Sequence, residues 1–218
     1  MNKYIRNIIP LLLLVFIFQS CANYKLNYAN DYKEWEKEVP TTDLKIKHSV
    51  YLIGDTGNAY KGLDIPLFAP LKEELDKASE NSSIIFLGDN IYPAGLPDEN
   101  KDPKGALIAK NHLDAQLKTV TNYKGKTIFI PGNHDWYNDG LKGLEREEKY
   151  IQKVLKNKES FFPENGCPIE KIEINDQIVV LAVDSQWYLT NWDMHPTMND
   201  DCEIKDREKF FQELEGLI

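Results

Sequence analysis

Three short phrases in this chain combine residue types that bind cations with positions that would bring them together. They are Gly54-Asp55-Thr56-Gly57, Gly88-Asp89-Asn90-Ile91-Tyr92 and Gly132-Asn133-His134-Asp135. Each follows a short apolar run, at 50–53, 84–87 and 127–130, that is typical of a buried strand. Open α/β sheets place their ligands beyond the carboxyl ends of their strands, so we expect these side chains to meet at one sheet edge.

The side chains in these phrases are suited to a pair of metal ions. Carboxylate and amide oxygens are hard donors, and two neighbouring carboxylates repel each other unless a cation lies between them. Asp55 is a candidate ligand of a first metal, and Asn133 offers an amide oxygen to a second. Asp89 can bridge the two metals because its carboxylate has two oxygens. Such a pair can clamp attacking and leaving oxygens and generate hydroxide near neutral pH.

The elements around these phrases alternate between strand and helix. The pattern predicts strands at 48–54, 83–88 and 126–131, and helices at 66–79, 105–121 and around 142–157, which indicates a layered α/β fold. Runs at 169–174 and 178–183 flank Asn175-Asp176-Gln177 and predict a hairpin, so we expect mixed rather than purely parallel pairing. Asp206 is placed to cap a last helix with apolar residues at helical spacing.

The amino terminus has the pattern of an export signal. Basic residues precede an apolar run at 8–18, which is too short to span a membrane comfortably and leads to Ser20-Cys21. A small residue before a cysteine resembles the lipobox of bacterial lipoproteins, which implies that Cys21 is acylated and holds the chain at a membrane of the cell envelope, on its periplasmic or cell-surface face. The alternative is an uncleaved anchor. We therefore expect a signal peptide at 1–21, a tether at 22–46 and one domain at 47–218.

Charge and cysteine content limit the partners of this domain. Asp and Glu number 35 against 26 Lys and Arg, and a formal charge of -9 disfavours binding to nucleic acid. Beyond Cys21, the sequence contains Cys167 and Cys202 in a compartment that permits disulfides. These two residues either pair or remain free thiols, since sequence does not fix their separation.

The three phrases resemble the first three of five motifs of the calcineurin-like metallophosphoesterase superfamily, over roughly residues 48 to 218. They are most similar to its purple acid phosphatase branch, because Gly57 stands where the superfamily has a histidine and Tyr92 lies three residues after Asp89. The resemblance implies an α/β/β/α sandwich with mixed sheets and two metal ions, iron plus a divalent iron, zinc or manganese. Asp55, Asp89 and Tyr92 would bind the iron, and Asp89 and Asn133 the second metal.

The resemblance also implies an activity. Metal-bound hydroxide would hydrolyse phosphate monoesters on a phosphorylated small molecule or a phosphoprotein. His134 would position the phosphate or protonate the leaving oxygen, with Asp135 as its orienting partner. The loops at 91–104 and 185–204 would determine the substrate. Trp136 and Tyr137 could wall the substrate mouth, although two aromatic residues after a strand end are more often packing residues, and Asp184 is expected to have a structural role.

Two further motifs of the superfamily, which supply three histidines, are missing from this chain. His48, His112 and His195 are expected to be surface or loop residues rather than replacement ligands. We therefore expect a domain truncated at its carboxyl terminus, and the alternative function is an inactive envelope lipoprotein with a partial metal site. A phosphodiesterase, or an aspartic protease suggested by Asp55-Thr56-Gly57, agrees less well with the whole set of motifs.

Overall fold

The computed structural model describes residues 45–59, 66–190 and 197–218. The chain divides into two units, Met1–Lys45 and Ile46–Ile218, and the account that follows concerns the second. The predicted signal peptide, Cys21, nearly all of the tether and His195 lie outside the described residues. Within the described ranges, none of the helices has the length and apolar character needed to cross a membrane.

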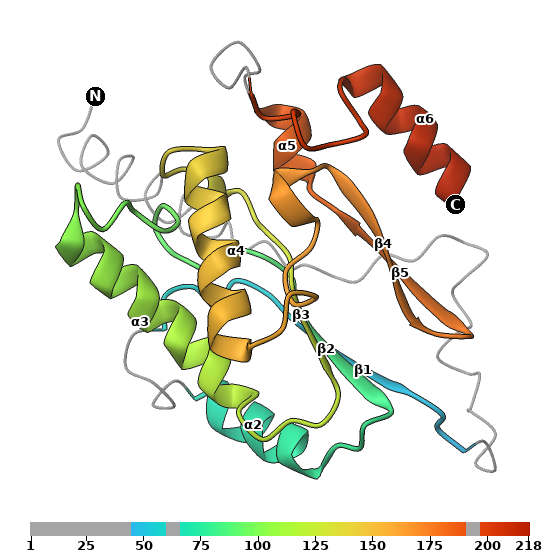
Figure 1. Ribbon diagram of the computed structural model, residues 1–218. Coiled ribbons are helices and arrows are strands. Elements are labelled where there is room, and N and C mark those ends of the chain that lie inside the picture. Colours follow the sequence, from blue (N-terminus) through green and yellow to red (C-terminus); the bar gives the residue numbers. More distant parts are fainter. Residues whose placement is uncertain (1–44, 60–65, 191–196) are drawn as a thin grey trace, which may run out of the picture. The chain divides into compact units, whose positions relative to one another are not determined.

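A parallel sheet of three strands forms the centre of the domain (Figure 1). Its order is β1 (Ser49–Ile53), β2 (Ser82–Phe86) and β3 (Lys126–Phe129), with Ile53 opposite Phe86 and Phe86 opposite Phe129. Every residue of the central strand β2 is buried, which explains its nearly continuous apolar sequence. The three predicted strands are confirmed, and their carboxyl ends lie at the same sheet edge.

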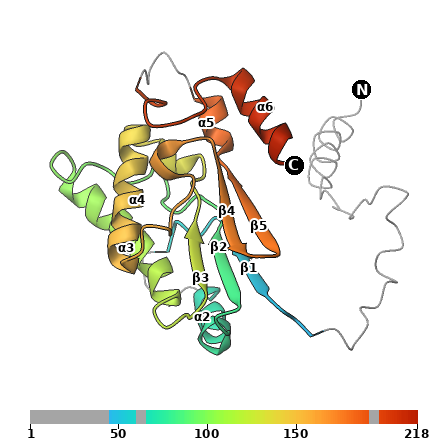
Figure 2. The ribbon, with the colours of Figure 1, turned by 45° about the vertical axis from the view of Figure 1, so that its right-hand side comes forward.

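Three helices cover one face of this sheet (Figure 2). They are α2 (Phe68–Lys77), α3 (Pro103–Thr119) and α4 (Leu141–Leu155). The start of α3 is set locally, because Pro103 occupies the first turn and the Asp102 carboxylate accepts a hydrogen bond from the Gly105 amide. Stacked rings of Phe86 and Phe129, 4.1 Å apart, form part of the main core beneath the helices. The predicted helices are confirmed, with shifts of a few residues at their ends.

The other face of the sheet packs against a hairpin of β4 (Ile169–Asn175) and β5 (Ile178–Val183). The predicted hairpin is confirmed, but it forms a separate antiparallel sheet rather than adding to the parallel one. The expectation of mixed pairing within a single sheet is therefore corrected. The physical reason is a second apolar core between the two sheets, in which Ile172 and Ala182 of the hairpin meet Ile85 and Ile128. Helix, sheet and hairpin layers together confirm the layered α/β fold.

The last described segment, at 197–218, is joined to the region around the hairpin by packing and by a disulfide. It contains α6 (Arg207–Leu217), whose predicted cap is confirmed because the Asp206 carboxylate accepts from the Lys209 amide. Phe210 is buried and stacks on Trp187 of the short helix α5 (Ser185–Leu189), with ring centroids 5.6 Å apart. A disulfide joins Cys167 to Cys202, so the structure selects the paired alternative.

Candidate metal centre

The carboxyl ends of the three parallel strands bring the first two predicted metal ligands together. Asp55 follows β1 and Asp89 follows β2, and both contact the same hydroxyl group. The Tyr92 oxygen lies 2.7 Å from Asp55 Oδ1 and 2.6 Å from Asp89 Oδ2. A hydroxyl has one proton, so the two carboxylates share it, and three oxygen donors converge on one point.

The turns that carry these ligands are bonded to each other through the backbone. Asp55 and Asp89 have φ angles of 57° and 53°, a left-handed conformation that costs free energy unless neighbouring contacts fix it. Those contacts are present. The Asp55 amide donates to the Gly88 carbonyl at 3.2 Å, and the Gly57 amide donates to the Asp89 carbonyl at 2.9 Å. The Tyr92 amide donates to the Gly57 carbonyl at 3.0 Å, so the first turn is held on both sides.

Two glycines permit this close approach. A Cβ atom at Gly57 would lie 2.5 Å from the Ile91 amide nitrogen and would also overlap the carbonyl of Asp89. A Cβ atom at Gly132 would overlap the carboxylate of Asp89. No side chain fits at position 57 in this backbone, which gives a physical reason for glycine in place of a histidine at that position of the first motif.

One expectation about the histidines is wrong. His112, expected at the surface, is 3% exposed within α3, and its ring contacts the Gly57 carbonyl through Nδ1. Burial lowers the pKa of His112, which favours the neutral ring in this position. His112 therefore supports the first motif from the protein interior, through its contact with the Gly57 carbonyl. His48, just before β1, bonds through Nε2 to the Ser83 hydroxyl at 3.0 Å and is half-buried rather than free at the surface.

A buried polar network joins the first two motifs, and the sequence did not reveal it. The Thr56 hydroxyl donates to Gln116 Oε1 at 2.8 Å, and Gln116 Nε2 donates to the Asn90 carbonyl at 2.7 Å. Asn90 Nδ2 in turn donates to Glu147 Oε1 at 3.1 Å and to the Ile130 carbonyl at 2.9 Å. The residue after each of the two aspartates, Thr56 or Asn90, therefore points into the protein and anchors its turn.

Asp135 completes this network from the third motif. Its carboxylate, which is fully buried, accepts hydrogen bonds from the backbone amides of Gly132 at 2.8 Å, Ile91 at 3.0 Å and Asn90 at 3.2 Å. Burial raises the pKa of Asp135 to about 7. Burial, followed by the charge of Asp135, raises the pKa of Glu147 well above its ordinary value. Asp135 therefore ties the second and third turns together.

The expected orientation of His134 by Asp135 is also corrected. In the described structure the three backbone amides occupy the Asp135 carboxylate, and His134 Nδ1 instead lies 2.6 Å from the Pro93 carbonyl. A carbonyl only accepts, so Nδ1 carries a proton, and Nε2 of the neutral ring is left as the acceptor. The ring lies between Tyr92 and Tyr137, at centroid distances of 4.4 and 4.9 Å.

Asn133 and its neighbours form the second side of the site. Asn133 Nδ2 donates to the Tyr137 hydroxyl at 2.5 Å, which leaves the amide oxygen as the free donor of electrons to a metal. Tyr137 was expected to be a packing residue, but it is 54% exposed beside the site. Trp136 does pack in the interior, and its Nε1 donates to Asp184 at 2.7 Å. Asp184 also caps α5 by accepting from the Gln186 and Trp187 amides, so its structural role is confirmed.

These residues surround an open cleft of about 570 Å³. One wall is polar and contains Asp55, Asp89 and Asn133. Apolar surface comes from Leu87 and, at the end of β5 and in α5, from Val183 and Leu189. Of the two loops expected to determine the substrate, the one at 185–204 contributes residues of α5 to this cleft. No residue of the loop at 91–104, all of which the structure describes, lines the cleft, although Tyr92 of that loop contacts Asp55 and Asp89.

The donor set fits hard metal ions. Hydrogen bonds to Asp89 and then Asp55 raise the pKa of Tyr92 above its ordinary value, because the two carboxylates hold its proton. A cation there would compensate both carboxylates and favour the tyrosinate. Among the described residues there is no cluster of three or more His, Cys, Asp or Glu side chains, because the convergent donors are two aspartates with a tyrosine and an amide. The four predicted metal ligands thus lie at one edge, without histidine ligands in the described ranges.

Comparison with known families gives an independent result. Residues 48–216 match the model of the calcineurin-like phosphoesterase family. Searches of curated proteins and of solved structures find no match. Members of the matched family generally bind two metal ions, which agrees with the chemistry of the convergent oxygen donors. The matched region covers most of the chain and includes the three strands and the three motifs that follow them, so the chain belongs to the calcineurin-like phosphoesterase family.

Proposed function

We propose that this protein is a metal-dependent phosphatase that hydrolyses phosphate monoesters at a dinuclear centre and resembles purple acid phosphatases. The observation that carries this proposal is the Tyr92 hydroxyl between the carboxylates of Asp55 and Asp89. Within the family, a tyrosine that shares the point of convergence of two aspartates is a reason to assign the iron-binding branch. When bound, the metals would polarise a phosphate group and activate water.

The residues of the chain have separate roles in this proposal. Asp55, Asp89 and Tyr92 would hold iron, and Asp89 with the amide oxygen of Asn133 would hold a divalent metal. His134 has Nδ1 bonded to the Pro93 carbonyl, so its Nε2 is the atom left for the substrate, and only when Nε2 also carries a proton would it donate to a phosphate oxygen or to the leaving group. Asp135 acts through the backbone as a positioning residue.

A metal-loading experiment tests the proposal directly. The chain is purified with Cys21→Ser to prevent acylation, loaded with iron and then zinc or manganese, and assayed with p-nitrophenyl phosphate and its diester. We expect two metals per chain, faster turnover of the monoester, and a visible tyrosinate-to-iron absorption. Tyr92→Phe should remove the absorption, and Asp89→Ala should reduce the affinity for both metals by at least about tenfold. Asp176→Asn, an exposed hairpin-turn variant, is the matched control. Retention of both metals in Asp89→Ala would contradict the bridging role.

A second candidate function is a catalytically inactive envelope protein with a partial metal site. The observation that favours it is the lack of histidine ligands around the four oxygen donors in the described ranges. Oxygen donors alone bind zinc and iron less selectively than sites that include imidazole. Metal uptake without hydrolysis of either ester would support this candidate, and hydrolysis that depends on Asp89 would exclude it.

We also propose that the chain is exported and held at the bacterial envelope by acylation of Cys21. This proposal is supported by the order of basic, apolar and small residues before Cys21. Mass spectrometry of the protein from bacterial membranes would detect diacylglycerol on Cys21. Unmodified protein that retains residues 1–20 would contradict it.

A further inference from the structure

A second, smaller pocket lies between the helices, with a lining unlike that of the metal centre. Its volume is about 250 Å³, and its walls come from α3, α4 and the loop at 96–99. Leu96, Pro97 and Tyr150 supply apolar surface, while Lys110, Arg146, Lys149 and Lys153 supply positive charge. None of the residues assigned to the metal centre lines it.

The spacing of α4 explains why the positive charges gather here. Residues 146, 149, 150 and 153 recur at three- and four-residue intervals and so lie on one face of the helix. Lys110 reaches the same pocket from α3, with its Nζ 5.9 Å from the centre of the Tyr150 ring. Four cations and one carboxylate, Glu99, line the pocket, although the chain as a whole has a charge of -9.

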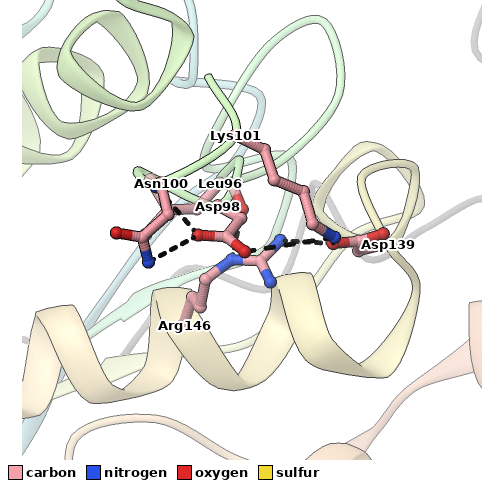
Figure 3. A network of polar contacts seen from close by, with 6 residues as sticks. All are labelled: Leu96, Asp98, Asn100, Lys101, Asp139 and Arg146. Carbon is pink, nitrogen blue, oxygen red and sulfur yellow. Dashed lines mark hydrogen bonds and ion pairs between the residues drawn. The ribbon is translucent and has the colours of Figure 1, made fainter. Parts of the chain in front are cut away.

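Fixed contacts shape the pocket before any ligand binds. Arg146 Nε donates to the Leu96 carbonyl at 3.0 Å, and its Nη2 lies 3.4 Å from Asp139 (Figure 3). Lys101 also lies 3.6 Å from the Asp139 carboxylate, but its side chain is 72% exposed, so this pair adds little. Tyr150 is fixed as well, because its hydroxyl donates to Asp114 at 2.7 Å. Preformed pockets bind small ligands at a lower entropic cost than pockets that must assemble.

The charges at the rim remain available to a ligand. Lys149 pairs with Glu145 of the same helix, and its side chain is 72% exposed, so this pair contributes little and exchanges readily. Lys153 is exposed and has no carboxylate partner in the part of the chain that the structure describes. Lys110 pairs with Glu99, which is itself 68% exposed. An anion entering the pocket would therefore meet uncompensated positive charge at Lys153.

We propose that this pocket binds a small organic monoanion, in which a carboxylate or similar group is attached to an aromatic body. The ring would pack on Tyr150, Leu96 and Pro97, and the anionic group would pair with Lys153 and Lys149. The apolar walls disfavour inorganic anions, and the size of the pocket limits the ligand to a single ring with short substituents. This site is independent of the proposed phosphatase activity.

The test uses benzoate and its neutral analogue benzamide with the 15N-labelled chain. In amide NMR spectra, benzoate should shift saturably the resonances of Leu96, Tyr150 and Lys153. Benzamide should bind about two- to fivefold more weakly, the range that partly exposed ion pairs contribute. Lys153→Gln should weaken benzoate by a similar factor. Lys142→Gln removes an exposed lysine of the same helix outside the pocket and should change nothing.

Three results would overturn the proposal. Equal affinity for benzoate and benzamide would show that charge is not recognised. Equal effects of Lys153→Gln and Lys142→Gln would show that the helix attracts anions without a defined site. Binding to phosphatidylglycerol vesicles in the absence of benzoate binding would assign these lysines to a membrane surface instead.

Discussion

Replacement of Gln116 by methionine tests whether the buried network holds the site together. Gln116 is fully buried in α3, accepts from the Thr56 hydroxyl at 2.8 Å and donates to the Asn90 carbonyl at 2.7 Å. Methionine has nearly the same shape but cannot form either bond. Each buried group that loses its partner costs roughly 1–3 kcal/mol, and the Thr56 hydroxyl can rotate toward another acceptor, so we expect a loss of about 2–4 kcal/mol.

A double-mutant cycle separates this bond from simple packing. Thr56→Val removes the other partner without changing shape, and alone it should cost about 1 kcal/mol. The double variant contains no Thr56 hydroxyl that could be left without a partner. Its loss in free energy of unfolding should therefore be smaller than the sum of the two single losses by about 1 kcal/mol. Urea unfolding, followed by tryptophan fluorescence, measures all four free energies. Losses that add to within about 0.5 kcal/mol would refute the coupling of the first two motifs through Gln116.

Three further predictions concern other parts of the fold. Gly57→Ala should destabilise the domain by more than about 2 kcal/mol, because the added Cβ would lie 2.5 Å from the Ile91 amide nitrogen. Gly216→Ala is the control, because a Cβ there meets no neighbour. Equal midpoints of unfolding for the two variants would contradict the prediction. Replacing both disulfide cysteines by serine should cost about 4 kcal/mol, because the bond closes a loop between residues 35 apart; an unchanged thermal midpoint would show that the link is dispensable. Burial raises the pKa of Asp184 to about 7, above its value in the unfolded chain, so protonation of Asp184 stabilises the folded domain. This contribution to the free energy of unfolding is complete below about pH 4 and is lost as the pH rises to 7. Thermal midpoints across this range should fall less in Asp184→Asn than in the parent, and parallel curves would refute the assignment.

Sequence patterns predicted the parts of the site that depend on strand geometry. Strands β1 and β2 are adjacent and parallel, so residues that follow them must lie near each other once the register is set. Asp55, Asp89 and Tyr92 meet for this reason. The hairpin was also predictable from its turn, but its pairing with a separate sheet was not, because alternation of apolar residues does not specify a partner strand.

The contacts that fix the site could not be predicted in the same way. Gln116 and Glu147 look like surface residues of amphipathic helices, and only the packing of α3 and α4 on the sheet buries them. His134 was assigned to a neighbouring carboxylate, yet its ring bonds to the Pro93 carbonyl, 41 residues away in the sequence. A backbone acceptor in a distant loop leaves no signal in side-chain composition.

The arrangement of these turns bears on how metals would bind. Asp55 and Asp89, the aspartates predicted to bind metal, line the cleft, and the residue that follows each, Thr56 or Asn90, points into the polar network. Backbone hydrogen bonds between these turns support the strained φ angles at Asp55 and Asp89. Because supporting groups already fix the donor oxygens, metal binding would need little rearrangement of the chain. It follows that Gln116→Met should weaken metal affinity even though Gln116 touches none of the ligand oxygens.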